Sequence, residues 1–221
     1  MAEMLQRFDL LAAFWMTLRL AVMGAAGALL LGTLVAVMRV SPFSSLQFFA
    51  RTYVTLIRNS PLTLVLFFCV FGLMNGLGLR FGETLETQNL FWGVVAIAVY
   101  HASFVAEALR SGINTVPVGQ AEAARAVGLP FLPALRHVIM PQAVRGSVAP
   151  VGNVMVALTK NTTVAATVGI TEAAATMKTM IEFYPNFLYF IFALVALGFV
   201  VLTLPTGLLF TWLSRKVAVQ R

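Results

Sequence analysis

The sequence predicts an all-α membrane protein with five transmembrane helices, formed by residues 1–221 as a single domain. Hydrophobic residues make up 60% of the chain and charged residues only 10%, against ~25% charged in typical soluble domains. Several long apolar segments result, near the ~20 residues that cross the hydrocarbon of a bilayer. The net charge of +7 comes mostly from basic residues at the ends of these segments, where lipid contact and orientation explain them. A lipid bilayer is therefore the expected surrounding, and nucleic acid is excluded as a partner.

The first expected span runs from about Leu10 to Met38 and carries no charge after Arg19. Residues 1–9 lack the net positive charge of a signal peptide, so this span is expected to be retained. Its small residues would allow close contact with another helix. The glycines among them are Gly24, Gly27 and Gly32.

The second and third spans are separated by a polar loop. An amphipathic connector is expected over residues 43–57, and the second span follows in the charge-free stretch between Arg58 and Arg80. Residues 75–88 are rich in glycine and charge and form the loop. The third span then runs from about residue 89 to residue 108.

Polar residues lie toward the end of the third span. His101 is expected to be an interior residue whose ring is satisfied within the bundle. Glu107 and Arg110 are three positions apart on one helix face, so their side chains can pair.

The fourth span is short and interrupted. The charge-free stretch over residues 146–159 is too short to cross ~30 Å of hydrocarbon at ~1.5 Å per residue. Lys160 must then lie within the membrane or at its edge. An interrupted span of this kind points to a substrate site in transporters. Two other interpretations stay open, in which Lys160 extends to the interface or pairs with Glu172.

The last part of the chain is expected to form a small amphipathic helix outside the bilayer, over residues 172–182, and a final span. That span runs from about Pro185 to Leu213 and is expected to be kinked by Pro205. Basic residues follow it at Arg215, Lys216 and Arg221.

Basic residues concentrate on alternate sides of the spans. The first connector holds three arginines and no acid, and the segment from Arg110 to Arg145 holds four arginines. The other loops are nearly balanced in charge. By the positive-inside rule, the N-terminus lies outside, and the segment between the third and fourth spans lies in the cytoplasm together with the C-terminus.

The segment over residues 117–141 is too polar for the bilayer core and is expected to form a water-exposed elbow. The alanine-rich run from Ala121 to Val127 predicts a short helix that stops at Gly128. Pro130 and Pro133 prevent that helix from continuing, and the apolar residues after them are spaced for a second short turn.

This elbow resembles a known sequence motif. Glu122, Ala123, Ala124 and Gly128, followed at the motif's spacing by residues 138–141 (VIMP), are similar to the EAA loop of bacterial ABC importer permeases. The tripeptide alone would fit an ordinary loop, but Gly128 and the terminal Pro141 are also in register. In that family the loop docks in a cleft of a cytoplasmic ATPase.

Other segments resemble the amino-acid branch of these permeases, and together they look most like actinobacterial glutamate uptake permeases. They are residues 58–64 (RNSPLTL), 104–113 (FVAEALRSGI) and 157–165 (ALTKNTTVA). That branch usually has glutamine where this sequence has Val65.

The resemblance implies the type I ABC importer permease fold in a bacterial inner (plasma) membrane. It implies a homologous second permease subunit, with a heterodimer favoured over a homodimer, two cytoplasmic ATPase subunits that bind ATP and Mg, and an extracellular substrate-binding protein. It assigns ATPase coupling to Glu122, Ala123, Ala124, Gly128 and Pro141. The candidates for the path of a polar amino acid, glutamate favoured, are Arg58, Asn59, Pro61, Lys160, Asn161, Thr162 and Thr163.

The chain itself is not expected to be an enzyme. It has no phosphate-binding GxxxxGK[ST] loop, no catalytic constellation in a water-facing segment, and no spacing of metal ligands. Cys69 is the only cysteine, so an internal disulfide is excluded. The alternative functions are a subunit of an ATP-independent secondary amino-acid transporter and a membrane anchor that only assembles other subunits.

Overall fold

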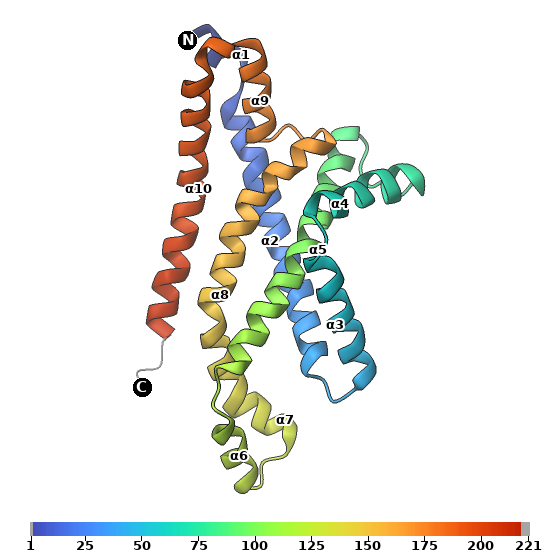
Figure 1. Ribbon diagram of the computed structural model, residues 1–221, viewed down its shortest axis with the longest axis vertical. Coiled ribbons are helices and arrows are strands. Elements are labelled where there is room, and N and C mark those ends of the chain that lie inside the picture. Colours follow the sequence, from blue (N-terminus) through green and yellow to red (C-terminus); the bar gives the residue numbers. More distant parts are fainter. Residues whose placement is uncertain (1, 218–221) are drawn as a thin grey trace.

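The computed structural model describes residues 2–217, and helices are their only regular secondary structure. Four long helices run along the molecule in Figure 1. They are α2 (Leu10–Val40), α5 (Leu85–Asn114), α8 (Met140–Asn161) and α10 (Leu188–Val217). Helix α5 packs against α2 and α8, while α10 packs against α8 and α9 (Ala173–Phe183). The all-helical prediction is confirmed.

The expected small-residue face of the first span packs directly on α5. A Cβ atom built on Gly24 would lie 2.7 Å from Ile97, and one built on Gly32 would lie 2.6 Å from Val105. Such distances are shorter than real Cβ contacts, so the two helix backbones approach as closely as they do only because these positions are glycine.

Gly32→Val is therefore expected to lower the free energy of unfolding by about 1–3 kcal/mol, because the added methyl groups overpack the contact between α2 and α5. The measurement is thermal melting of the purified protein in detergent. Leu34→Val, at a 58% exposed position on the same helix, is the control and should change the melting temperature little. Equal effects of both changes would contradict a close contact at Gly32.

Three helical segments are long and apolar enough to cross a membrane within the described residues: Leu10–Val40, Leu85–Asn114 and Pro185–Val217. A fourth candidate is a bent pair, in which α3 (Ser44–Arg58) and the helical segment Leu62–Gly76 meet at 106°. That segment comprises α4 (Leu62–Phe67) and the wider π-helix η1 (Phe68–Gly76).

The expected connector over residues 43–57 is thus a regular helix of the bundle, with Ala50 and Val54 buried between α2 and α5. The expected second span begins at Leu62 instead of directly after Arg58. Pro61 accounts for the break, because proline has no N–H to donate and disfavours helical backbone at the residue before it.

Helix α8 is longer than the charge-free stretch on which the fourth span was predicted. It has 22 residues, begins at Met140 and includes Arg145, whose side chain is exposed. At ~1.5 Å per residue it extends about 33 Å. The helix thus extends beyond the charge-free stretch at its N-terminal end, and the predicted interruption after Lys160 is real. There α8 gives way to the tighter 3-10 helix η3 (Thr162–Val168).

Glu172 caps α9 and is fully buried. Its carboxylate accepts hydrogen bonds from the backbone N–H groups of Ala174 and Ala175, at 2.9 and 2.8 Å, and lies beside the Thr17 hydroxyl of α2. Lys160 is exposed and forms no ion pair with Glu172. The alternative in which Lys160 pairs with Glu172 was wrong, because the end of α9 already supplies the donors that this carboxylate needs.

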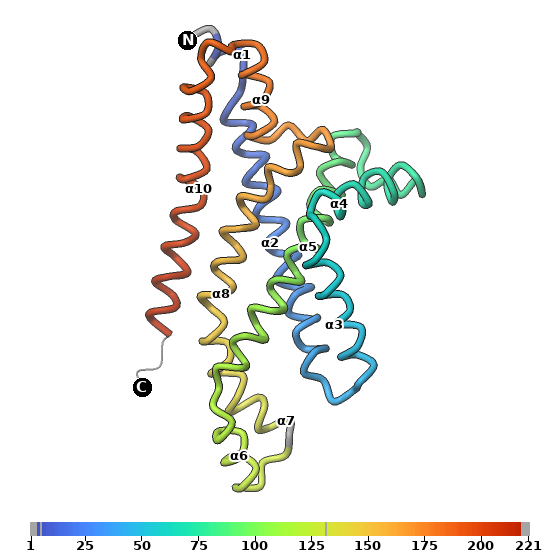
Figure 2. Tube along the Cα trace, viewed as in Figure 1, coloured from blue at the N-terminus to red at the C-terminus, as the bar shows by residue number. Residues whose placement is uncertain are grey.

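The remaining elements lie at the two ends of the molecule. At one end, α1 (Ala2–Arg7) packs near α9, and the 3-10 turn η4 (Pro185–Phe187) leads into α10, which continues through Pro205. At the other end, α6 (Val118–Ala126), α7 (Phe131–Ala134) and the π-helical turn η2 (Leu135–Ile139) project beyond the bundle, as the chain trace in Figure 2 shows. Arg221, which contributed to the predicted orientation, lies outside the described residues.

Candidate functional site

The elbow between α5 and α8 has the helix end that its sequence predicts. The N–H of Leu129 donates to the carbonyl of Ala124 at 3.0 Å, and the N–H of Gly128 donates to the carbonyl of Arg125 at 2.9 Å. These two bonds form a Schellman motif, which needs a left-handed residue after the helix. Gly128 supplies it, with φ +82°. The predicted stop at Gly128 is confirmed.

The elbow presents an apolar surface outside the bundle. Ala124 is buried and holds α6 in place, whereas Glu122 and Ala123 are exposed. Three large apolar side chains are at least two thirds exposed around them: Val118 at 74%, Val127 at 77% and Leu132 at 69%. Exposed apolar side chains on a segment outside the bundle are typical of a protein-binding surface. Pro141 lies in the first turn of α8, at the base of this elbow.

Two of the residues predicted to lie on the substrate path, Lys160 and Asn161, line a groove between α8 and α10. The groove has a volume of about 770 Å³, and its walls include Lys160, Asn161 and Asn153 from α8 and Thr203 and Thr211 from α10. The ammonium of Lys160 is exposed to this space.

The two threonines after Asn161 cap the helix end instead of lining the groove. Thr162 is buried, and its hydroxyl donates to the carbonyl of Thr159 at 2.8 Å. The hydroxyl of Thr163 donates to the carbonyl of Lys160 at 2.9 Å.

An aromatic pocket of about 230 Å³ lies beside the groove, between α5 and α8. Tyr100, His101 and Phe104 line it from α5, and Asn153 and Asn161 belong to both the pocket and the groove. The two spaces therefore lie beside each other along α8, and together they are called the strip of cavities below. No local pattern in the sequence indicated this pocket, because its walls come from helices far apart in the chain.

His101 is an interior residue, as predicted, and it links α5 to the interrupted span. Its Nδ1 lies 2.9 Å from the carbonyl of Ile97, and its Nε2 lies 3.0 Å from Nδ2 of Asn161. A carbonyl only accepts and an amide nitrogen only donates, so the neutral ring carries its proton on Nδ1. This hydrogen bond fixes the orientation of Asn161 toward the pocket.

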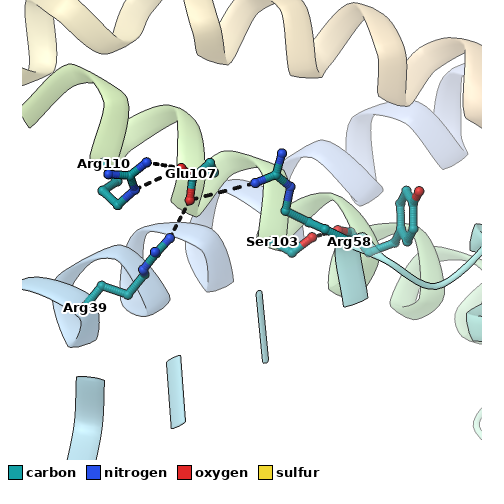
Figure 3. A network of polar contacts seen from close by, with 6 residues as sticks. Arg39, Arg58, Ser103, Glu107 and Arg110 are labelled. Atoms are coloured by element: carbon teal, nitrogen blue, oxygen red, sulfur yellow. Dashed lines mark hydrogen bonds and ion pairs between the residues drawn. The ribbon is translucent and has the colours of Figure 1, made fainter. Parts of the chain in front are cut away.

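Three arginines converge on Glu107 (Figure 3). The predicted pair is confirmed: Arg110 donates to Glu107 Oε1 through Nη2 and, at 2.9 Å, through Nε. Arg39 of α2 donates to Oε2 at 2.5 Å, and Nη1 of Arg58 lies 3.9 Å from the same oxygen. The last two partners come from α2 and α3, and no local pattern in the sequence indicated them.

Arg58 and Asn59 line a separate polar cavity of about 380 Å³. Phe104 belongs to this cavity and to the aromatic pocket, so it stands between the two. Pro61 lies at the bend between α3 and α4 and shapes the backbone there. Arg58 thus lines one of these two spaces and Asn161 the other, while Phe104 lines both.

Glu107→Gln is expected to destabilise the bundle by about 1–3 kcal/mol, because it removes the shared counter-charge of arginines on three different helices. Thermal melting of the purified protein measures the effect. Glu182→Gln is the control: Glu182 is 61% exposed and lies 4.0 Å from Lys178, and such exposed pairs contribute about 0–1 kcal/mol. A larger loss at Glu182 than at Glu107 would contradict this assignment.

The comparison with protein families decides what kind of protein holds these features. A family model described as "Binding-protein-dependent transport system inner membrane component" matches residues 28–219. The chain belongs to this family. It is therefore a multi-pass permease component of ABC transporters, located in the inner membrane, as the sequence predicted.

Similar proteins agree with this membership. The permease is 48% identical over 218 residues to "Glutamate transport system permease protein GluC" of Corynebacterium efficiens, covering 96% of each chain. It is 35% identical to "Probable glutamine ABC transporter permease protein GlnM" of Bacillus subtilis, covering 92% of this chain and 91% of that one. The predicted resemblance to actinobacterial glutamate permeases is confirmed.

Solved structures show the same fold. A chain of an amino acid ABC transporter crystallised with histidines superposes on the permease with a TM-score of 0.83, at 27% identity, covering 94% of this chain and 93% of that chain. A chain of the MetNI methionine ABC transporter gives a TM-score of 0.73 at 19% identity, covering 95% and 96%. The predicted type I ABC permease fold is confirmed.

Proposed function

We propose that the chain is the permease subunit of an ATP-driven importer that moves a polar amino acid, glutamate favoured, into the cytoplasm. The observation that carries this proposal is the connection between the elbow and the strip of cavities. Helix α5 leads from Tyr100 and Phe104 directly into the elbow, and α8 leads from the elbow to Asn161. A force applied to the elbow therefore acts on both helices that line the pocket.

The proposed topology has five crossings. The bent pair from α3 to η1 would be the second crossing and α8 the fourth, between the three long apolar spans. The N-terminus would lie outside, and the elbow and the C-terminus in the cytoplasm. The excess of arginine near the elbow supports this orientation.

The proposed partners follow from the family. Two cytoplasmic ATPase subunits would bind ATP and Mg and dock on the elbow through Glu122, Ala123, Ala124 and the exposed apolar side chains around them. Gly128 and Pro141 would hold the elbow in the shape that docks. A homologous second permease subunit would complete the membrane part, as a heterodimer in preference to a homodimer. An extracellular binding protein would deliver the amino acid.

The proposed substrate path follows the strip from the groove to the aromatic pocket. Lys160 would attract a substrate carboxylate, because a cation beside apolar walls interacts more strongly than one in bulk water. The hydrogen bond from Nδ2 of Asn161 to His101 orients the Asn161 side chain, so that its amide oxygen can accept a hydrogen bond from the substrate. Closure of the ATPase pair would move the docked elbow as a rigid lever and switch the path between outward-open and inward-open states.

Reconstitution tests the proposal. The permease is assembled with its ATPase, its second permease subunit and its binding protein in vesicles, and uptake of labelled glutamate, glutamine, aspartate and arginine is measured with and without ATP. We expect uptake that requires ATP, with glutamate taken up best. Uptake by the permease without any ATPase, driven by an ion gradient, would instead support a secondary transporter.

A further inference from the structure

The arginines around Glu107 leave one guanidinium without a matching anion. Both carboxylate oxygens of Glu107 are occupied, Oε1 by Arg110 and Oε2 by Arg39. Nη1 of Arg58 lies 3.9 Å from Oε2, which is beyond hydrogen-bonding distance. Three cationic side chains against one carboxylate give a formal charge of +2 for this cluster. Arg58 is the member that Glu107 neutralises least.

Arg58 is held in place with its donors free. Its guanidinium lies over the ring of Phe104, 5.2 Å from the centroid, and this stacking orients the group. Among residues 2–217, no atom accepts a hydrogen bond from it, and its side chain is 40% exposed. A guanidinium has five N–H donors in a planar fork that matches a carboxylate. Arg58 is therefore an oriented cation that still lacks an acceptor.

The space in front of Arg58 is suited to an anion. The cavity of about 380 Å³ is also lined by Thr55 and Asn59, whose hydroxyl and amide can donate to an oxyanion beside the guanidinium. Arg39 and Glu107 line it too, and the Glu107 carboxylate is already bonded to Arg39 and Arg110. Neither side chain has a hydrogen-bond partner within the described part of the chain. Charge, free donors and space coincide at one place, next to the wall formed by Phe104.

We infer that the cavity of Arg58, Thr55 and Asn59 binds a carboxylate, and that it receives a carboxylate of the transported amino acid after the aromatic pocket. This inference rests on the proposed function, which it makes more specific. A second cationic site at the far side of Phe104 from Lys160 suits a substrate with two carboxylates. The cavity thus selects acidic over neutral amino acids within the permease itself.

Kinetics of the reconstituted complex test the site. For Arg58→Gln we expect the KM for glutamate to rise at least about tenfold, since a charged hydrogen bond is lost, while the KM for glutamine changes less than about twofold. Arg58→Lys keeps the charge and should restore most of the glutamate affinity. Arg51→Gln is the matched control on α3, where Arg51 is exposed and bonded only to Gln47 at 3.1 Å, and it should leave both KM values unchanged.

Other outcomes overturn the inference. An equal rise for both substrates, or a fall in maximal rate alone, means that Arg58 is structural. An oxyanion could also come from a lipid headgroup, so the assays are repeated in vesicles with and without phosphatidylglycerol. An Arg58 effect that occurs only with the anionic lipid assigns the cavity to lipid and contradicts a substrate site.

A binding measurement separates this inference from the proposed function. Glutamate at millimolar concentration should raise the melting temperature of the purified complex, glutamine should not, and Arg58→Gln should abolish the difference. If this pattern holds while the complex imports no glutamate, the site stands and the proposed function fails. If the complex imports glutamate but neither KM nor melting depends on Arg58, the inference fails alone.

Discussion

Gly128→Val is expected to leave the permease inserted in the membrane and to reduce ATP-dependent uptake at least about tenfold. Gly128 has φ +82°, and a β-branched residue there is strained by about 1–2 kcal/mol or more. The strain acts on the backbone alone, because no atom lies within 4 Å of the position that a Cβ would take. The Schellman motif would open, and the exposed apolar side chains of the elbow would lose their arrangement.

The matched control is Gly119→Val in the same elbow. Gly119 also has open space around its Cβ position, but it lies within α6 and has an ordinary backbone conformation. Uptake, membrane insertion and co-purification with the ATPase are measured for both variants. Normal uptake by the Gly128 variant, or an equal loss in both, would show that the shape of the elbow does not matter for coupling.

Glu122→Lys, which reverses an exposed charge beside Ala123, should likewise uncouple transport from the ATPase without loss of membrane insertion.

Lys160→Ala is expected to raise the KM for glutamate by about tenfold or more, while insertion and assembly stay normal. The ammonium of Lys160 is exposed in a groove whose walls are mostly apolar, so it is a strong attractor for a carboxylate. Uptake at a series of glutamate concentrations gives the measurement.

Lys178→Ala is the control for that change, because Lys178 is 80% exposed on α9 and lies outside the groove. It should leave the KM unchanged. If Lys160→Ala transports glutamate with normal affinity, Lys160 only extends to the membrane interface, and the substrate path must depend on other residues.

Features that depend only on a few neighbouring residues could be predicted from the sequence. The stop at Gly128 follows from glycine's access to left-handed backbone, and a close helix contact at Gly24 and Gly32 follows from their small size, although the partner helix was not predicted. The motif residues of the elbow were also found by their spacing. Their roles in coupling stay predictions, because the structure shows their positions and exposure alone.

Contacts between residues far apart in the chain could not be predicted from the sequence. The cluster of Glu107 with Arg39 and Arg58 requires that α2, α3 and α5 meet at one place, and hydropathy does not encode which helices are neighbours. The full length of α8 was also not predicted, because the charge-free stretch over residues 146–159 was counted alone, and a helix can continue through an exposed charge such as Arg145 at its end.

Cysteine cross-linking in intact cells tests the proposal that the elbow binds a cytoplasmic ATPase. Val127→Cys places a thiol on an apolar position of the elbow that is 77% exposed, and the native Cys69 is buried. We expect Val127→Cys to cross-link to the ATPase subunit and to be shielded from a membrane-impermeant reagent added outside. Labelling from the outside, without any cross-link to the ATPase, would contradict the account.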